Sequence, residues 1–225
     1  MLKAAAKLSF VEIQKEIVFW FFKSKWLQEP LMEQCISTLE DYFSSFKKWF
    51  LSPLHYSRVI RLCFEHLVDI YIERFIYGAK KTYHTTLLKE YEPKQIIMQY
   101  FDEKKKEAGQ KTISTETYAN KERLIAAMAK DQEKILSAIQ KNYSNMIPKS
   151  TVEKITKNFT LVASLLTIQE YDFQDYFVPI YETYGEDGKY ILESCLSIRE
   201  DRDTSLRKKL GAIYLQYVSK LAAES

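Results

Sequence analysis

The sequence predicts an all-α protein, on three observations. Gly and Pro number only five each among 225 residues, so the chain has few of the residues that many-stranded sheets need at their turns. Apolar residues recur at the 3.6-residue spacing of helices along most of the chain. Hydrophobic residues make up 46% of the sequence, which is enough for the core of one large domain or two small ones.

The first predicted helix spans residues 4–27 and is apolar on two opposite faces, as is typical of a helix packed between partners. We expect one face to pack on the second and third helices. The opposite face is then expected to meet a partner outside the chain, unless later helices of the same chain cover it. The packing face comprises Phe10, Ile13, Ile17, Trp20 and Leu27, and the candidate partner interface comprises Val18, Phe19, Phe22 and Trp26, in line with Leu8 and Val11.

The second and third helices are bounded by prolines. Pro30 suits the first turn of a helix that reaches about residue 50. Ser52-Pro53 then breaks the pattern, and a long third helix runs to about residue 89, with Ser52 or Ser57 as its cap. The spacing places Phe43 in the core against this third helix, together with Phe46 or Leu39.

The second half of the chain predicts further helices with short connections. A short helix at 93–101 precedes a polar loop at 102–117, and another helix begins at Asn120. Ser150 or Thr151 is expected to cap the next helix, a shorter one follows residue 172, and two short helices come last, separated at Asp203. We therefore expect a helical bundle at 1–117 and another at 118–225, or one continuous rod.

The sequence lacks the residue sets that catalysis and cofactor binding need. It holds no GxSxG, GxxxxGK[ST] or GxGxxG motif, and its three histidines lie far apart, so no metal or organic cofactor is expected. Cys35, Cys63 and Cys195 have no CxxC spacing and are expected to be buried free thiols. The longest apolar run is six residues, whereas a membrane span needs about 20.

Two charged clusters need an explanation. The carboxylates at 200–203, around Asp201, would suit a magnesium-dependent helical enzyme, but Arg199 and Arg202 neutralise them, and a solvated turn with Asp203 as N-cap is favoured. Lys104–Lys106 could contact anionic lipid, but adjacent acids cancel its charge, and a solvated loop is favoured. The net charge of +3 indicates no nucleic-acid binding.

Three phrases carry a family resemblance. ISTLEDYFSSF (36–46), IRLCFEHLVDIYIERFIYGAK (60–80) and ILESCLSIREDRDTSLRKKL (191–210) occur in this order. Together, over about residues 31–214, they resemble the C-terminal region of the Sec-six subunit of the exocyst. Members of that family extend upstream, so the chain is expected to be a fragment of a longer protein.

The resemblance implies an elongated rod of antiparallel helical bundles, of the tethering-complex type. It implies a non-enzymatic, cytoplasmic subunit that is peripheral at plasma-membrane sites of secretion and tethers secretory vesicles before SNARE-mediated fusion. The implied partners are other exocyst subunits and SNAREs or SNARE regulators, with membrane contact only indirect or peripheral. A related helical-rod tether or a membrane-remodelling paralogue is the alternative, and a helical enzyme using the carboxylates near Asp201 is a more distant one.

Overall fold

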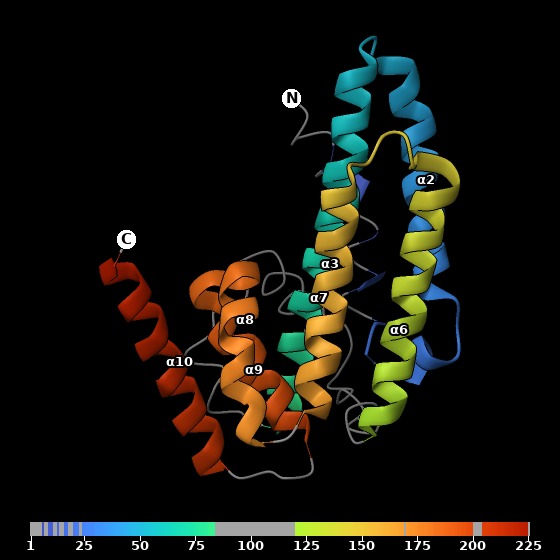
Figure 1. Ribbon diagram of the computed structural model, residues 1–225. Coiled ribbons are helices and arrows are strands. Elements are labelled where there is room, and N and C mark those ends of the chain that lie inside the picture. The colour runs from blue at the N-terminus through green and yellow to red at the C-terminus, as the bar shows by residue number, and fades with distance from the viewer. Residues whose placement is uncertain are drawn as a thin grey trace, which may run out of the picture.

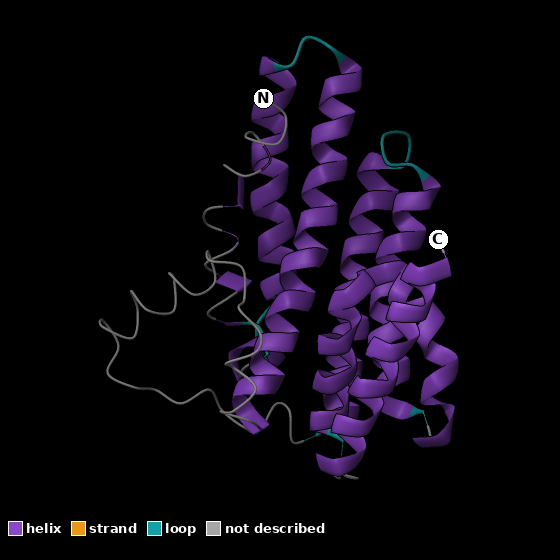
Figure 2. Ribbon diagram, turned by 90° about the vertical axis from the view of Figure 1, so that its left-hand side faces the viewer, coloured by secondary structure: helices purple, strands orange, loops and turns teal. Residues whose placement is uncertain are grey.

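The chain folds into helices, as predicted. The computed structural model describes residues 24–83, 120–168, 170–199 and 204–224, and no strand occurs among them (Figure 2). Before residue 24 it describes Ala6, Ser9, Phe10, Ile13, Glu16, Ile17, Trp20, Phe21 and Phe22. The predicted helix at 93–101 and the predicted loop at 102–117 lie outside the described residues.

Short connections at 50–52 and 144–148 each join two long helices into a hairpin, and these four helices run close to a common direction (Figure 1). Short 3-10 helices occur at Ser24–Leu27, Glu170–Tyr176 and Gly185–Asp187. A π-helical turn at Ile139–Tyr143 directly follows helix α6 (Lys121–Ala138). The α-helices are α2 (Leu31–Trp49), α3 (Pro53–Tyr83), α6 (Lys121–Ala138), α7 (Lys149–Thr167), α8 (Phe177–Tyr184), α9 (Gly188–Ile198) and α10 (Thr204–Glu224).

The helices pack in successive layers. The α2–α3 hairpin lies against the α6–α7 hairpin, with α2 on α6 and α3 on α7; α9 packs on α3 and α7, and α10 covers α9 (Figure 1). Described helices on either side of residue 117 thus contact one another, and the division into bundles at 1–117 and 118–225 stays a prediction.

The core forms where the apolar stripe of α2 meets α3 and the end of α6. Phe43, Phe46 and Leu39 are all buried, as predicted. The Phe43 ring lies 5.9 Å from that of Phe64 on α3 and 5.4 Å from that of Tyr143 in the π-helical turn. Phe43 therefore joins three helical segments that are far apart in the sequence.

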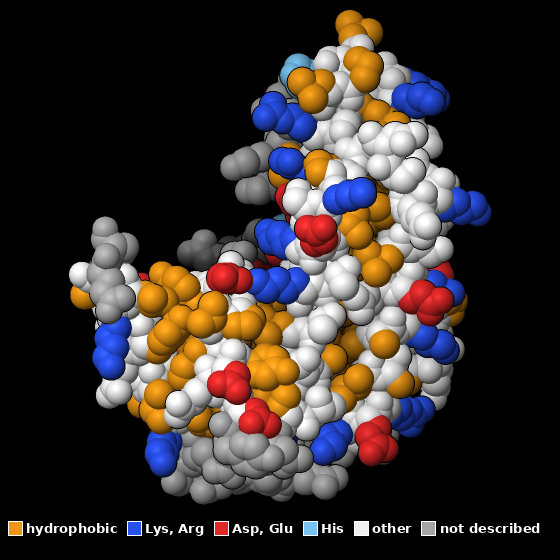
Figure 3. All heavy atoms as spheres, viewed as in Figure 1, with side chains coloured by type: hydrophobic (Ala, Val, Ile, Leu, Met, Phe, Trp, Pro, Cys, Tyr) orange, Lys and Arg blue, Asp and Glu red, His pale blue; other side chains and the backbone are white. Residues whose placement is uncertain are grey.

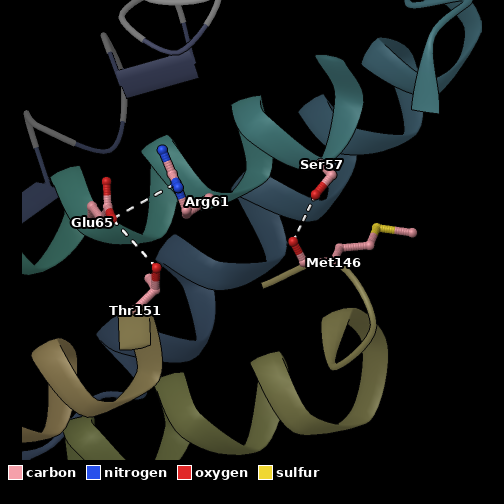
Figure 4. Close-up of polar contacts among 5 residues, drawn as sticks. All are labelled: Ser57, Arg61, Glu65, Met146 and Thr151. Atoms are coloured by element: carbon pink, nitrogen blue, oxygen red, sulfur yellow. Dashed lines mark hydrogen bonds and ion pairs between the residues drawn. The ribbon is translucent and has the colours of Figure 1, made fainter. Parts of the chain in front are cut away.

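Polar contacts fix the α6–α7 turn to the α2–α3 hairpin (Figure 4). Ser57 Oγ donates a hydrogen bond to the carbonyl oxygen of Met146 at 2.6 Å, and Thr151 Oγ1 approaches Glu65 Oε1 at 3.5 Å. Asn142 Nδ2 donates to Glu40 Oε1 at 2.7 Å. These contacts hold the two hairpins in register.

The predicted helix ends are confirmed in part. Asn120 caps α6, and its side chain accepts the backbone N–H of Arg123 at 2.8 Å. The prediction that Ser150 or Thr151 caps α7 is wrong, because Pro148 occupies the N-cap and Thr151 is buried in the first turn. The last helix, α10, has 21 residues and is not short.

The N-terminal segment differs most from its prediction. Described residues up to Trp20 are helical, but Phe21 and Phe22 form a turn, and Phe22 has a φ of 62°. A non-glycine residue in this left-handed region marks a sharp change of chain direction. The predicted helix at 4–27 is therefore wrong at its C-terminal end.

Candidate interaction surface

The predicted partner interface on the N-terminal segment is largely internal where it is described. Phe22 is fully buried and Trp26 is 5% exposed, so the expectation that they meet an outside partner is corrected. Later helices of the same chain cover them: the Phe22 ring lies 5.0 Å from Tyr71 and 5.7 Å from Phe75, both on α3. Val18 and Phe19 lie outside the described residues.

The opposite face behaves as predicted at three of its described positions. Phe10, Ile13 and Ile17 are buried, and the Phe10 ring meets the His66 ring of α3 at 4.7 Å. Trp20, which was expected to pack with them, is 36% exposed. The turn at residues 21–22 explains how one short segment buries residues from both predicted faces.

A buried carboxylate ties this segment to the bundle. Asp131 of α6 accepts hydrogen bonds through Oδ2 from Trp26 Nε1 at 2.7 Å and from Tyr71 Oη at 2.9 Å. Burial raises the pKa of Asp131 to about 7, and Glu33 adds to the rise, while the two hydrogen bonds and Lys130 oppose it. This carboxyl group therefore titrates near neutral pH.

The raised pKa makes stability depend on pH. Because the folded pKa is about 7 against 3.8 for a free carboxyl group, the fold favours protonated Asp131. The stabilisation that protonated Asp131 gives the folded state is complete below about pH 4 and is lost as the pH rises to about 7. We expect Asp131→Asn, which retains an acceptor oxygen, to flatten this part of the pH profile in urea denaturation. Asp175→Asn, on an exposed carboxyl group, is the control, and an equal slope in parent and Asp131→Asn would contradict the prediction.

Two grooves flank α7 and offer hollows that a partner could enter. The first, of ≈ 540 Å³, lies between α7 and α8. The second, of ≈ 330 Å³, lies between α7 and α6. Thr160 and Ser164 line both grooves, so α7 forms a low ridge between them. The first groove is also lined by Val152, Thr156, Leu161, Tyr176 and Pro179, and the second by Ile125, Ala129, Gln132, Ala163 and Thr167.

The grooves arise from the size of side chains on the outer face of α7. Thr156, Thr160 and Ser164 follow one another at four-residue intervals, while the core side of α7 carries the buried Ile155 and Val162, and buried Phe159 borders the second groove. Lys157, which lines the first groove, forms an ion pair with Glu182 of α8, with Nζ and Oε2 2.6 Å apart. These small residues are visible in the sequence. The stronger apolar pattern of α7, however, predicts only which side of the helix faces the core.

The remaining sequence candidates do not form a chemical site among the described residues. All three cysteines are buried and free, as predicted, and burial raises the pKa of Cys35 to about 12 and of Cys63 to about 11. Such thiols are unreactive. No group of three His, Cys, Asp or Glu side chains in the described part of the chain could hold a metal ion.

Arg199 has a role at the end of α7 that the sequence did not predict. It is buried over the Phe173 ring, and its Nη1 donates to the carbonyl oxygens of Ile168 and Leu165 at the end of α7. A cation at this position complements the negative end of the helix. The carboxylates at 200–203, which Arg199 was expected to neutralise, lie outside the described residues.

Comparison with known proteins supports one family. A family model described as "Exocyst complex component Sec6" matches residues 10–203. Neither the comparison with curated proteins nor that with solved structures gave a match.

Proposed function

Because the chain belongs to the Sec6 family of exocyst complex components, we propose that it acts in vesicle tethering by receiving partner helices in the two grooves beside α7. The family is one of non-enzymatic subunits that tether vesicles in exocytosis, and other exocyst subunits are its partners. We further propose SNAREs or SNARE regulators as partners, and a cytoplasmic location peripheral to the plasma membrane at sites of secretion.

The paired grooves are the observation that carries this proposal. A groove between two neighbouring helices can take an amphipathic helix, whose apolar residues at i, i+3, i+4 and i+7 enter it. The small side chains of Thr160 and Ser164 allow the backbone of such a helix to approach α7 closely. The two grooves on either side of α7 could bind two partner helices at once, or one partner helix in either groove.

A bulky cation on the shared ridge should close both grooves. Thr160 is exposed, so Thr160→Arg leaves the core intact while placing a long charged side chain at the border of the two hollows. We expect binding to purified exocyst subunits to weaken by about tenfold or more, because a contact at the centre of an interface dominates its affinity. Titration of the fluorescently labelled chain with each purified subunit, and with purified SNARE proteins, measures the effect.

The matched control is Ser37→Arg, the same kind of change at an exposed position of α2 outside the grooves. Equal affinity of Thr160→Arg and Ser37→Arg for every partner would disprove the role of the grooves. If Thr160→Arg weakens binding to exocyst subunits but leaves binding to SNAREs unchanged, SNAREs do not bind in these grooves.

A further inference from the structure

The end of the α2–α3 hairpin exposes an unusual set of apolar side chains. Trp49 is 71% exposed, Leu51 98% and Leu54 65%, which makes them the most exposed large apolar side chains in the described chain. They sit around the 50–52 connection, where a polar turn would be ordinary. Hydrophobic side chains gather at this extremity of the molecule, with basic side chains beside them (Figure 3).

The exposed side chains stand on a rigid support. The buried Phe46 ring holds the rings of Trp49 and Phe50, each with its centroid at 5.9 Å. Pro53 begins α3 directly after the connection. The hairpin also reaches beyond the α6–α7 turn, so its end is convex and projects from the bundle (Figure 1).

Charge around the hairpin end has a single sign. From residue 42 to residue 64 the sequence contains four basic residues and no Asp or Glu. Lys47, Lys48 and Arg58 are exposed and have no ion partner among the described residues. The two lysines complement the C-terminal end of α2. This interaction with the helix end explains why residues 47 and 48 are positively charged. It does not explain why the neighbouring Trp49, Leu51 and Leu54 are exposed.

We propose that the end of the α2–α3 hairpin inserts into the surface of an anionic membrane. Tryptophan favours the level of the lipid headgroups, and leucine favours the acyl chains below them. Lysine and arginine at the membrane surface bind anionic headgroups. A convex end with protruding apolar side chains fits a deformable bilayer, whereas a partner helix fits a groove. None of the described helices is long and apolar enough to span a membrane, so this contact is peripheral.

Trp49 provides a direct readout of insertion. Vesicles of phosphatidylcholine containing phosphatidylserine should bind the chain and shift its tryptophan emission to the blue, while pure phosphatidylcholine should bind weakly. Higher salt should weaken the binding because it screens the charges. Trp49→Phe, made together with Trp20→Phe, should keep most of the binding in vesicle sedimentation but lose the emission shift, since the remaining Trp26 is already buried and Trp20→Phe alone should keep the shift.

Two pairs of substitutions separate the apolar and basic contributions. Lys47→Glu with Lys48→Glu should weaken binding to anionic vesicles by about 30-fold or more, because each basic residue at a membrane surface contributes about a factor of five. Leu51→Ser with Leu54→Ser should weaken it by about tenfold through lost apolar burial. Lys208→Glu with Lys209→Glu on α10, and Val178→Ser with Leu215→Ser, are the matched controls at exposed positions elsewhere.

We expect the two double variants at the hairpin end to lose vesicle binding and the two control double variants to retain it. Equal losses in both sets, or no binding of the parent chain to anionic vesicles, would overturn the proposal. If the hairpin pairs instead lose binding to purified exocyst subunits while vesicle binding is unchanged, the hairpin end is a protein interface and not a membrane one.

Discussion

Replacement of Phe43 by alanine is expected to lower the free energy of unfolding by about 3–5 kcal/mol. Phe43 is 1% exposed and packs against Phe64 and Tyr143, so its removal leaves a cavity where α2, α3 and the end of α6 meet. Neighbouring helices cannot close this cavity without breaking the polar contacts that hold the two hairpins in register. Urea denaturation followed by circular dichroism measures the change.

Trp49→Ala is the matched control, because it removes an aromatic side chain from the same helix at an exposed position. Its effect should stay within about 0.5 kcal/mol. An equally small effect of Phe43→Ala would mean that the register of α2 against α3 is wrong.

A methyl group at Gly188 is expected to lower the free energy of unfolding by about 2–4 kcal/mol. The Cβ atom of Gly188→Ala would overlap Ile180 Cγ2 and Tyr214 Oη and would lie 2.8 Å from Tyr214 Cζ. Tyr214 is fully buried, and its hydroxyl group donates to the carbonyl oxygen of Gly185 at 2.6 Å. The substitution therefore forces α10 away from α9 and breaks this hydrogen bond.

Hydrogen exchange of the α10 amides should locate the damage, since exchange there should rise while the amides of α2 and α3 remain protected. Tyr214→Phe removes one of the overlapping atoms. The double variant Gly188→Ala, Tyr214→Phe should thus be more stable than the two single effects predict when added. Strict additivity in this cycle would show that Gly188 and Tyr214 do not meet.

Helical periodicity predicted the elements whose burial is one-sided. α2 has a clear apolar stripe; its partner α3 and the burial of Phe43 followed from the spacing, and its bounds followed from Pro30 and Ser52-Pro53. The start of α6 at Asn120 was predicted, and the cap that fixes it is local, because the Asn120 side chain accepts the backbone N–H of Arg123, three residues away. Interactions of this local kind can be read from a sequence.

The N-terminal segment could not be predicted in the same way. Nothing near Trp26 in the sequence reveals that its indole N–H binds Asp131, which is 105 residues away. The turn at Phe22 also has no glycine to signal it, because the aromatic contacts with Tyr71 and Phe75 support its positive φ. The grooves beside α7 depend on where α6 and α8 lie, which periodicity within one helix does not specify.

The layered packing gives the molecule unequal resistance to mechanical load. A pull along the length of α2 and α3 would slide them past α6 and α7, and the whole length of the hairpin contact would have to yield at once. A pull at the C-terminal end of α10 would strip that helix turn by turn, because among the described elements it packs mainly on α9, with α8 and the Gly185–Asp187 turn beside it. Among the described helices, a force applied along the α2–α3 hairpin and α7 therefore meets more resistance than a force applied at the C-terminal end of α10, which should detach first.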